Sequence, residues 1–187
     1  MSIFTKTGSN QQLAMDGLRN TKLNWGRTAL RLHYQAEFGF VETSKGTKVD
    51  AVRLLNDTLR MELYNKDTNA LIPQPASFYD QFKFDISFNC FGYCFADSKV
   101  FLPNPTKFII DDYEEVNSEN AEIIIFKEYG GFNDNGEEVY SFSHAVKVLP
   151  NGNVSFKPGI NLLVENVPRS KAIHTYNFNY EIYLRKK

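Results

Sequence analysis

Nearly strict alternation between apolar and polar residues, in two separate runs, constrains the fold of this chain more than any other feature. The runs extend over residues 81–95 and 173–184. Because successive side chains of a β-strand point to opposite faces of a sheet, a period of two places one row on a core and leaves the other toward solvent or a partner. We therefore predict a long strand in each run. The apolar rows consist of Phe82, Phe84, Ile86, Phe88 and Cys90, and of Tyr176, Phe178, Tyr180, Ile182 and Leu184.

Length and composition favour one globular domain. A chain of 187 residues, 42% of them hydrophobic, can bury a sizeable core without splitting. Residues 1–20 differ from the rest, because they are rich in Ser, Thr, Asn, Gln and Gly and contain few bulky apolar side chains. We therefore predict a polar N-terminal arm over residues 1–20 and a single β-rich domain over residues 21–187.

Further strands follow from alternation, apolar runs and turn residues. Even-numbered residues from Leu30 to Phe40 are apolar, which predicts a strand from residue 28. Residues 123–126 form an apolar run typical of a strand buried on both faces. Asn and Gly in 133–136 and 150–153 predict hairpin loops that connect strands at 139–149 and 154–156.

Two other segments complete the secondary-structure prediction. Residues 47–64 fit both a helical and a strand pattern, and we favour a short helix or turn followed by a strand. Pro73 and Pro75 indicate a loop before the strand at 81–95. Many strands with turn chemistry between them and little helix predict a mainly β fold. We expect an antiparallel β-sandwich or jelly-roll-like domain with an extended N-terminal arm.

The charge balance and the N-terminus bear on partners and localisation. A formal net charge of −1 carries no overall electrostatic signal for nucleic acid, which we do not expect as a main partner. The first residues contain no apolar run of the kind found in a signal peptide, and no stretch approaches the ~20 apolar residues of a membrane span. We expect synthesis in the cytoplasm and no membrane partner.

A cysteine and a histidine are the candidates for catalysis. A thiolate beside an imidazole is the nucleophile and base of cysteine hydrolases and acyltransferases, which makes Cys90 or Cys94 with His144 a candidate dyad. Such enzymes place the cysteine at the start of a helix, whereas Cys90 continues an alternating row, where a small core residue is expected. In a strand the two cysteines lie roughly 13 Å apart, too far for a disulfide.

An acidic stretch is the candidate for a metal site. Calcium binds several carboxylate and carbonyl oxygens on flexible backbone, which makes this segment a candidate, although we favour a solvated acidic loop. The two cysteines and three dispersed histidines lack zinc-ligand spacing, and no Gly-rich phosphate loop is present, so we expect no cofactor. The acidic candidates are Asp111, Asp112, Glu114 and Glu115.

Aromatic residues raise the alternative of carbohydrate binding. A β-sandwich with exposed aromatic rings can bind sugars by stacking, and Trp25, the single tryptophan, is either such a platform or a plug that holds the arm. Tyr129 and several other aromatics fall in loops or off the predicted core rows, where they are candidates for interface anchors.

Basic clusters near both ends of the chain flank an acidic middle. This asymmetry suits charge-complementary contact between copies of the protein or with neighbouring subunits. We therefore expect a non-enzymatic structural or assembly subunit, by analogy at the level of the fold a bacteriophage virion protein. Carbohydrate binding and Cys/His-dependent hydrolysis or acyl transfer are the alternatives. The interface residues predicted for the arm and its junction are Phe4, Leu13, Met15, Leu18 and Trp25.

Overall fold

Strands arranged in two antiparallel sheets dominate the chain. The computed structural model describes residues 3–16, 27–97, 100–173 and 180–187, and it is 49% strand and 14% helix. The prediction of a mainly β, sandwich-like fold is confirmed. Sheet A contains β1 (Thr5–Lys6), β2 (Gln11–Asp16), β3 (Thr28–Glu42) and β4 (Lys48–Asn65). Sheet B contains β5 (Tyr113–Glu115), β6 (Ile123–Phe132), β7 (Glu138–Val148), β8 (Val154–Phe156), β9 (Val164–Val167) and β10 (Tyr180–Lys186).

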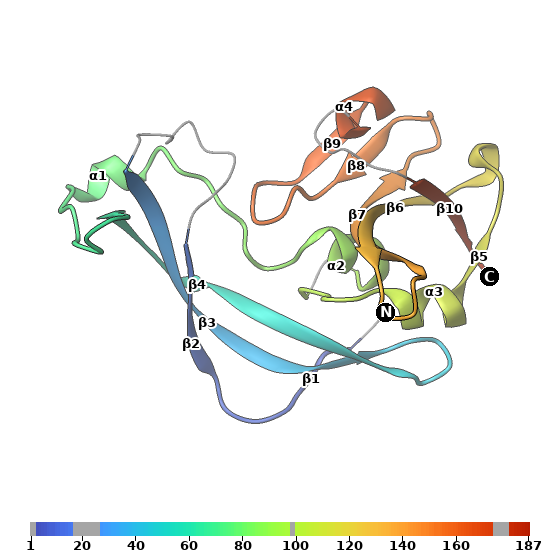
Figure 1. Ribbon diagram of the computed structural model, residues 1–187, viewed down its shortest axis with the longest axis horizontal. Helices are drawn as coiled ribbons and strands as arrows, with labels where there is room; N and C mark the ends of the chain where they lie inside the picture. The colour runs from blue at the N-terminus through green and yellow to red at the C-terminus, as the bar shows by residue number, and fades with distance from the viewer. Residues whose placement is uncertain (1–2, 17–26, 98–99, 174–179) are drawn as a thin grey trace.

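Short helices connect and cover these strands (Figure 1). They are α1 (Ala76–Tyr79), α2 (Cys90–Phe95), α3 (Thr106–Asp112), the 3-10 helix η1 (Ser118–Asn120) and α4 (Arg169–Ile173). The long β3–β4 ribbon crosses the molecule, and α1 lies at its far end, away from sheet B. α2 and α3 lie between the ribbon and sheet B.

Strand β4 is continuous where we predicted a helix or turn before a strand. Its register against β3 shifts once, because His33 pairs with Arg60 whereas Gln35 pairs with Leu55. Residues 56–59 are the extra residues of this irregularity, and the Thr58 hydroxyl satisfies backbone groups there by donating to the Leu55 carbonyl and accepting from the Gln35 N–H. The register shift moves apolar residues between faces, which produces the mixed periodicity of the sequence.

The N-terminal segment pairs with sheet A. β1 and β2 both lie along the same edge of β3, β1 opposite residues 39–40 and β2 opposite residues 31–36. Leu13 and Met15 of β2 pack on the apolar face of the sheet. The division into an arm over 1–20 and a domain over 21–187 stays a prediction, but residues 5–16 contribute strands to the body of the molecule.

The prediction of a strand over residues 81–95 is wrong. Residues 82–88 belong to no helix and to no strand pair among the described residues, and Phe84 and Ile86 pack on the apolar face of sheet A. The alternating residues therefore form a segment that packs on sheet A and is not one of its strands. α2 begins directly after Asn89, whose side chain accepts a hydrogen bond from the Gly92 N–H and caps the helix.

A buried lysine connects residues 82–88 to the end of β8. The Lys157 ammonium group donates to the backbone carbonyls of Asp85, Gly159 and Asn161 at 2.5–3.0 Å. Its side chain is 0% exposed. One charged group thus connects a segment before α2 with a loop that follows β8.

The last strand in the sequence lies inside sheet B. The strand order is β5-β10-β6-β7-β8-β9, so β10 separates β5 from β6. The predicted strand over 173–184 is confirmed from Tyr180 onward, whereas Ile173 ends helix α4. Tyr176 and Phe178 lie outside the described residues.

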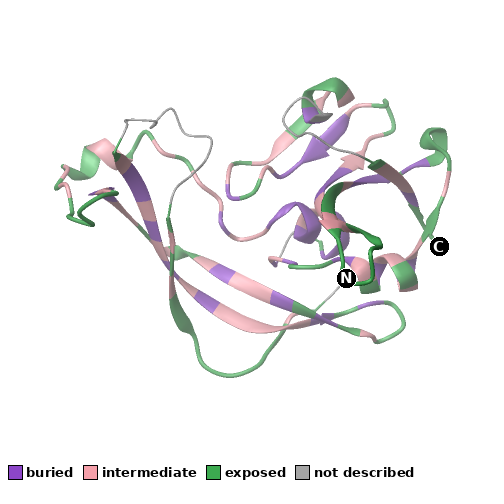
Figure 2. Cartoon of the chain, in the orientation of Figure 1, coloured by how far each residue is buried: buried purple, intermediate pink, exposed green. Residues whose placement is uncertain are grey.

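Three apolar clusters form the core. The first joins Val41 of β3 to Ile125 of β6 and includes buried side chains of α2 and α3, so it holds the two sheets together. The second lies on the β3–β4 ribbon under residues 82–86. The third lies on the opposite face of sheet B; it includes residues of β6, β7 and β8, and Ala172 of α4 packs on it. Figure 2 shows the buried stretches running through the middle strands of sheet B and along the ribbon.

Candidate interaction surface

Exposed aromatic side chains gather on the β6–β7 hairpin and the adjacent strand β10. Phe132 is 66% exposed and Tyr180 is 55% exposed, although both are large apolar side chains that normally lie inside a protein. We call this group the hairpin surface. It consists of Tyr129, Phe132, Tyr140 and Tyr180.

The rings form a continuous row of edge-to-face contacts. The ring centroids of Tyr129 and Phe132 are 5.9 Å apart, and those of Tyr129 and Tyr140 are 5.8 Å apart. Tyr140 contacts Tyr180 of β10 at 5.1 Å. Such contacts contribute about 0.5–1.5 kcal/mol each and restrict ring motion, so the surface is preformed.

The sequence of the hairpin explains why these rings meet. Tyr129 and Tyr140 are direct cross-strand partners, and a register shift next to Gly130 brings Gly131 opposite Val139. Asn133 organises the turn, because its side-chain oxygen accepts hydrogen bonds from the N–H groups of Asn135 and Glu137. The predicted hairpin loop at 133–136 is confirmed.

The hairpin surface continues the core-facing side of sheet B. Ile125, Ala145 and Ile182 lie on this side and contribute to the cluster between the sheets. Tyr180 lies on the same side, two residues from Ile182 on β10, and it pairs with Lys127. Beyond that cluster, no element in the described ranges covers the aromatic row, and Figure 2 shows the hairpin as mainly exposed.

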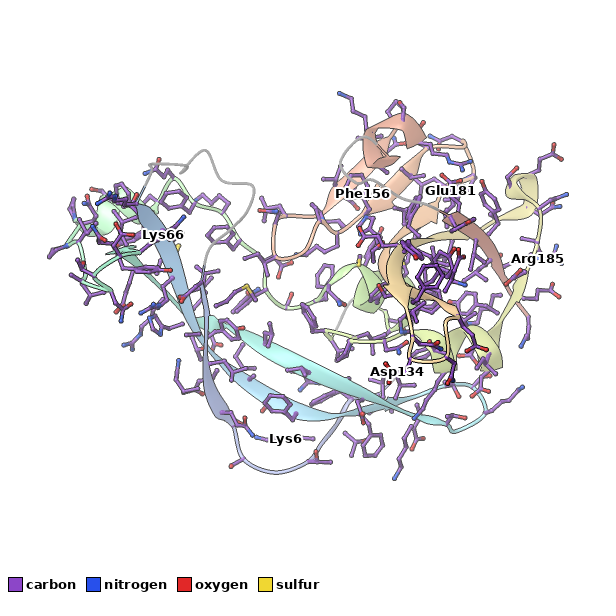
Figure 3. All side chains as sticks on the ribbon, in the orientation of Figure 1. Lys6, Lys66, Asp134, Phe156, Glu181 and Arg185 are labelled. Carbon is purple, nitrogen blue, oxygen red and sulfur yellow. The ribbon has the colours of Figure 1, made fainter. Side chains whose placement is uncertain are left out.

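The hairpin that carries the aromatic row also carries acidic side chains, although Glu128 points to the opposite face of β6 from Tyr129. Glu128, Asp134, Glu137 and Glu138 are all exposed, and none of them takes part in an ion pair with another described residue. The Tyr140 hydroxyl donates to the Glu138 carboxylate at 2.5 Å. This hydrogen bond raises the pKa of Tyr140 and keeps its hydroxyl protonated. Asp134 lies at the tip of the hairpin (Figure 3).

The candidate catalytic residues lie on two sides of sheet B. Cys90 packs in the cluster between the sheets and contacts the Ala145 backbone, whereas the His144 ring stacks on Phe126 and meets Phe156 edge to face on the other side. The structure therefore does not bring the Cys90 thiol and the His144 imidazole together. Cys90 does begin a helix, contrary to our expectation of a strand, but α2 is six residues long and both its cysteines are buried.

Burial is the main cause of the pKa shifts of Cys90, Cys94 and His144. It raises the pKa of Cys90 to about 11 and the pKa of Cys94 well above its ordinary value. It lowers the pKa of His144 to about 4. At neutral pH the two thiols are protonated and the imidazole is neutral, so neither the thiolate nor the imidazolium of the proposed dyad is present.

The candidate metal ligands bond to protein groups. The Asp111 carboxylate accepts from the Thr43 hydroxyl at 2.6 Å, and Asp112 accepts from the Ser44 N–H at 3.0 Å. Glu114 pairs with Arg185 at 2.7 Å, while Glu115 is exposed on β5. Within the described ranges, no group of three or more His, Cys, Asp or Glu side chains could hold a metal ion.

The candidate interface residues at the N-terminus pack on the chain itself. The Arg53 guanidinium lies 4.4 Å from the centre of the Phe4 ring, which also packs against the cluster between the sheets. Leu13 and Met15 pack on the ribbon. Leu18 and Trp25 lie outside the described residues, so the carbohydrate platform predicted at Trp25 stays a prediction.

The sequence predicts only part of the hairpin surface. It indicates Tyr129 as an interface candidate, whereas alternation places Tyr180 in a core row and gives no prediction for Phe132. A signal exists in the sequence, because bulky apolar residues directly flank both sides of the polar turn at 133–136. Alternation cannot show that α2, α3 and sheet A cover only part of the length of β6, β7 and β10.

A polar hollow of about 500 Å³ lies on the outer face of sheet A. The His33 Nε2 atom lies 2.8 Å from the Glu62 carboxylate within it. Its remaining side chains are mixed in charge, so they favour no particular ligand. They are Gln12, Gln35, Asp57, Thr58 and Arg60.

Comparison with models of protein families, with curated proteins and with solved structures finds no match. None of the helices in the described ranges has the length and apolar content that crossing a membrane requires. The hairpin surface is therefore the candidate functional site.

Proposed function

We propose that this chain is a non-enzymatic assembly subunit that docks on protein neighbours through the hairpin surface. The observation that carries the proposal is the row of exposed aromatic side chains on β6, β7 and β10. Contiguous exposed apolar patches on soluble proteins mark interaction surfaces, and Tyr and Phe are enriched at the centres of protein interfaces.

The rigidity of the row supports docking. Each ring is held by a neighbouring ring, and the Tyr140 hydroxyl is held by Glu138. A side chain that is ordered before binding loses less conformational entropy in the complex. The acidic groups at the edge of the row would form the polar rim of the interface.

Carbohydrate binding is the second candidate, because exposed tyrosines also bind sugars through their ring faces. The edge-to-face packing favours a protein partner instead. Tyr129 against Tyr140, and Tyr140 against Tyr180, direct ring edges at ring faces and leave fewer faces for a sugar. The particle in which such a subunit would assemble, a bacteriophage virion, stays a hypothesis from the sequence.

Sedimentation velocity of the full chain tests the proposal directly. We compare the wild type with the double variant Phe132→Ser, Tyr180→Ser over a wide concentration range. Both side chains are exposed, so their removal leaves the core intact. Because aromatic anchors at an interface centre contribute about 2 kcal/mol or more, the variant should associate at least about tenfold more weakly.

Leu162→Ser is the matched control, since Leu162 is an exposed apolar residue outside the hairpin surface. It should leave association unchanged. Association that survives the double substitution contradicts the proposal, and a wild type that stays monomeric throughout excludes docking on copies of the same chain. Glycan binding that is lost in the double variant of a monomeric protein would favour the carbohydrate candidate.

A further inference from the structure

We infer that the partner at the hairpin surface is a second copy of this chain, which contributes a lysine-rich surface around helix α3. This inference rests on the proposed function and names its partner. Its basis is charge complementarity between two surfaces that every copy carries.

The second surface surrounds the exposed side chain of Ile110, which is 63% exposed on α3. Lys107 lies one helical turn before Ile110, and its ammonium group donates to the Lys48 carbonyl at 2.7 Å. The Lys187 ammonium group donates to the Ile110 carbonyl at 2.5 Å. We call this the lysine surface. It consists of Lys45, Lys48, Lys107, Ile110 and Lys187.

The carboxylates of α3 offset only part of this positive charge, because Asp112 is buried whereas Asp111 interacts with Lys45 and Lys187. Asp111 and Asp112 turn toward the β3–β4 connection, where they accept hydrogen bonds from Thr43 and Ser44. The hydrogen bond from Thr43 holds the pKa of Asp111 below its ordinary value. Exposed acidic neighbours of Lys48 are Glu42, its partner in the β3–β4 pairing, and Asp50, two residues further along β4.

The two surfaces match in chemistry and are opposite in charge. The hairpin surface combines exposed aromatic side chains with mainly acidic charges, whereas the lysine surface combines one exposed apolar side chain, Ile110, with mainly basic charges. Some charged groups outside the two surfaces pair within the chain, as Arg53 does with Glu37 and Arg185 with Glu114. In the part of the chain that the structure describes, the four lysines form no ion pair, and neither do the four carboxylates of the hairpin. Both sets are therefore available to a partner.

Contact between two different surfaces sets the kind of assembly. A one-way contact of the hairpin surface on the lysine surface of the next copy is heterologous, and repetition of it gives a ring or a filament. A reciprocal contact, in which each copy offers both surfaces to the other, gives a closed dimer. Either arrangement requires the same pair of surfaces.

Charge reversal in the full chain tests the pairing. One variant carries Asp134→Lys and Glu137→Lys, and a second carries Lys45→Glu and Lys107→Glu. The control variant carries Lys66→Glu and Lys83→Glu, an equal change of charge at exposed lysines outside the lysine surface; Lys66 lies at the far end of the ribbon (Figure 3). Circular dichroism and urea unfolding of each variant confirm that it is folded.

We expect each reversal of a surface to weaken self-association by about tenfold or more, because like charges then face each other. The control variant should associate like the wild type. A chain that carries both reversals should regain association, since its charges are complementary again. In about 1 M salt, where the Debye length is about 3 Å, wild-type association should weaken.

The mixture of the two singly reversed variants gives a second result. One keeps a native hairpin surface and the other a native lysine surface, so together they should form a complex that neither forms alone. If Phe132→Ser, Tyr180→Ser abolishes association while Lys45→Glu, Lys107→Glu leaves it unchanged, the proposed function stands and the lysine surface is the wrong partner. Equal weakening by the control variant would also overturn the inference, because net charge alone would explain it.

Discussion

Lys157 determines the position of a long segment through one ammonium group. Its three acceptors are backbone carbonyls of Asp85, Gly159 and Asn161, and the group also lies 5.1 Å from the centre of the Phe88 ring. Desolvation lowers the pKa of Lys157 to about 8. A buried charge is tolerated because these hydrogen bonds replace its lost hydration.

Replacing Lys157 with Met, which has a similar length, should reduce the free energy of unfolding by about 3 kcal/mol, since three carbonyls lose a charged donor. Urea denaturation measures the change. Lys66→Met, at an exposed lysine, is the control and should stay within about 0.5 kcal/mol of the wild type. A Lys157→Met protein as stable as this control would show that the carbonyls find other donors.

His144 should make the protein sensitive to acid. Burial lowers its pKa from 6.5 to about 4, so between these values the unfolded chain binds a proton that the folded chain does not. Stability that is complete above pH 6.5 is lost as the pH falls toward 4, by at most about 3 kcal/mol. Urea unfolding at several pH values should give a shallower pH dependence for His144→Leu than for the wild type. Parallel curves for the two proteins would contradict this prediction.

At the scale of elements, α2 is held by two residues that alternation does not reveal. The Asn89 side chain caps the helix and also bonds both backbone groups of Leu102, donating to its carbonyl and accepting from its N–H. Gly92 lies against the backbone of Val100, and a Cβ atom at Gly92 would lie 1.7 Å from the Val100 carbonyl oxygen. Helix α2 and the segment after it therefore fit only with glycine at this position.

Gly92→Ala should separate α2 from residues 100–102 and lower the free energy of unfolding by about 3 kcal/mol or more, because the clash is with backbone. Thiol labelling of Cys90 and Cys94 should be slow in the native wild type, where both are buried, and faster in this variant. Gly130→Ala is the control, since its Cβ would lie 3.3 Å from the nearest atom, the Val139 carbonyl oxygen. Fast labelling of the native wild type would contradict the packing of α2.

The elements that sequence reasoning predicted well depend on local information. β3, the buried run of β6 and the hairpin loops at 133–136 and 150–153 follow from periodicity and turn chemistry within a few residues. The failures depend on distant partners. Phe84 and Ile86 alternate because they lie on sheet A, and the ambiguous pattern before Leu59 reflects a register shift against β3.

The candidate site was harder to predict than the fold for a related reason. Phe132 and Tyr180 have the side chains of core residues, and only the position of α2, α3 and sheet A decides that they remain exposed. Likewise, Cys90 and His144 lie on opposite faces of sheet B. Cys90 packs on Ala145, and the side chains of Ala145 and its neighbour His144 point to opposite faces of β7. Such facts belong to the packing of layers and not to any one strand.

At the scale of the whole molecule, the N-terminal residues stabilise the ribbon. Phe4 packs beside Gly39, where a Cβ would lie 2.1 Å from the Thr5 carbonyl oxygen, and Leu13 and Met15 cover the apolar face further along. Sheet A therefore needs β1 and β2 to complete one edge of β3.

Removal of residues 1–16 should lower the free energy of unfolding by about 3 kcal/mol, because three apolar contacts and two strand pairings are lost. Urea unfolding measures this change, and a dye that binds exposed apolar surface should report the uncovered ribbon. The single change Gln11→Ala, at an exposed residue of β2, should have little effect. A truncated chain as stable as the full chain would show that β1 and β2 only rest on the ribbon.

The place of β10 inside sheet B sets an order on folding during synthesis. All the other described strands leave the ribosome before β10, yet β5 and β6 join through β10 alone. Until then β6 has an open edge with buried-type residues at 123–126, the kind of edge that pairs with other chains. Nascent chains should therefore depend on chaperones until β10 has been made.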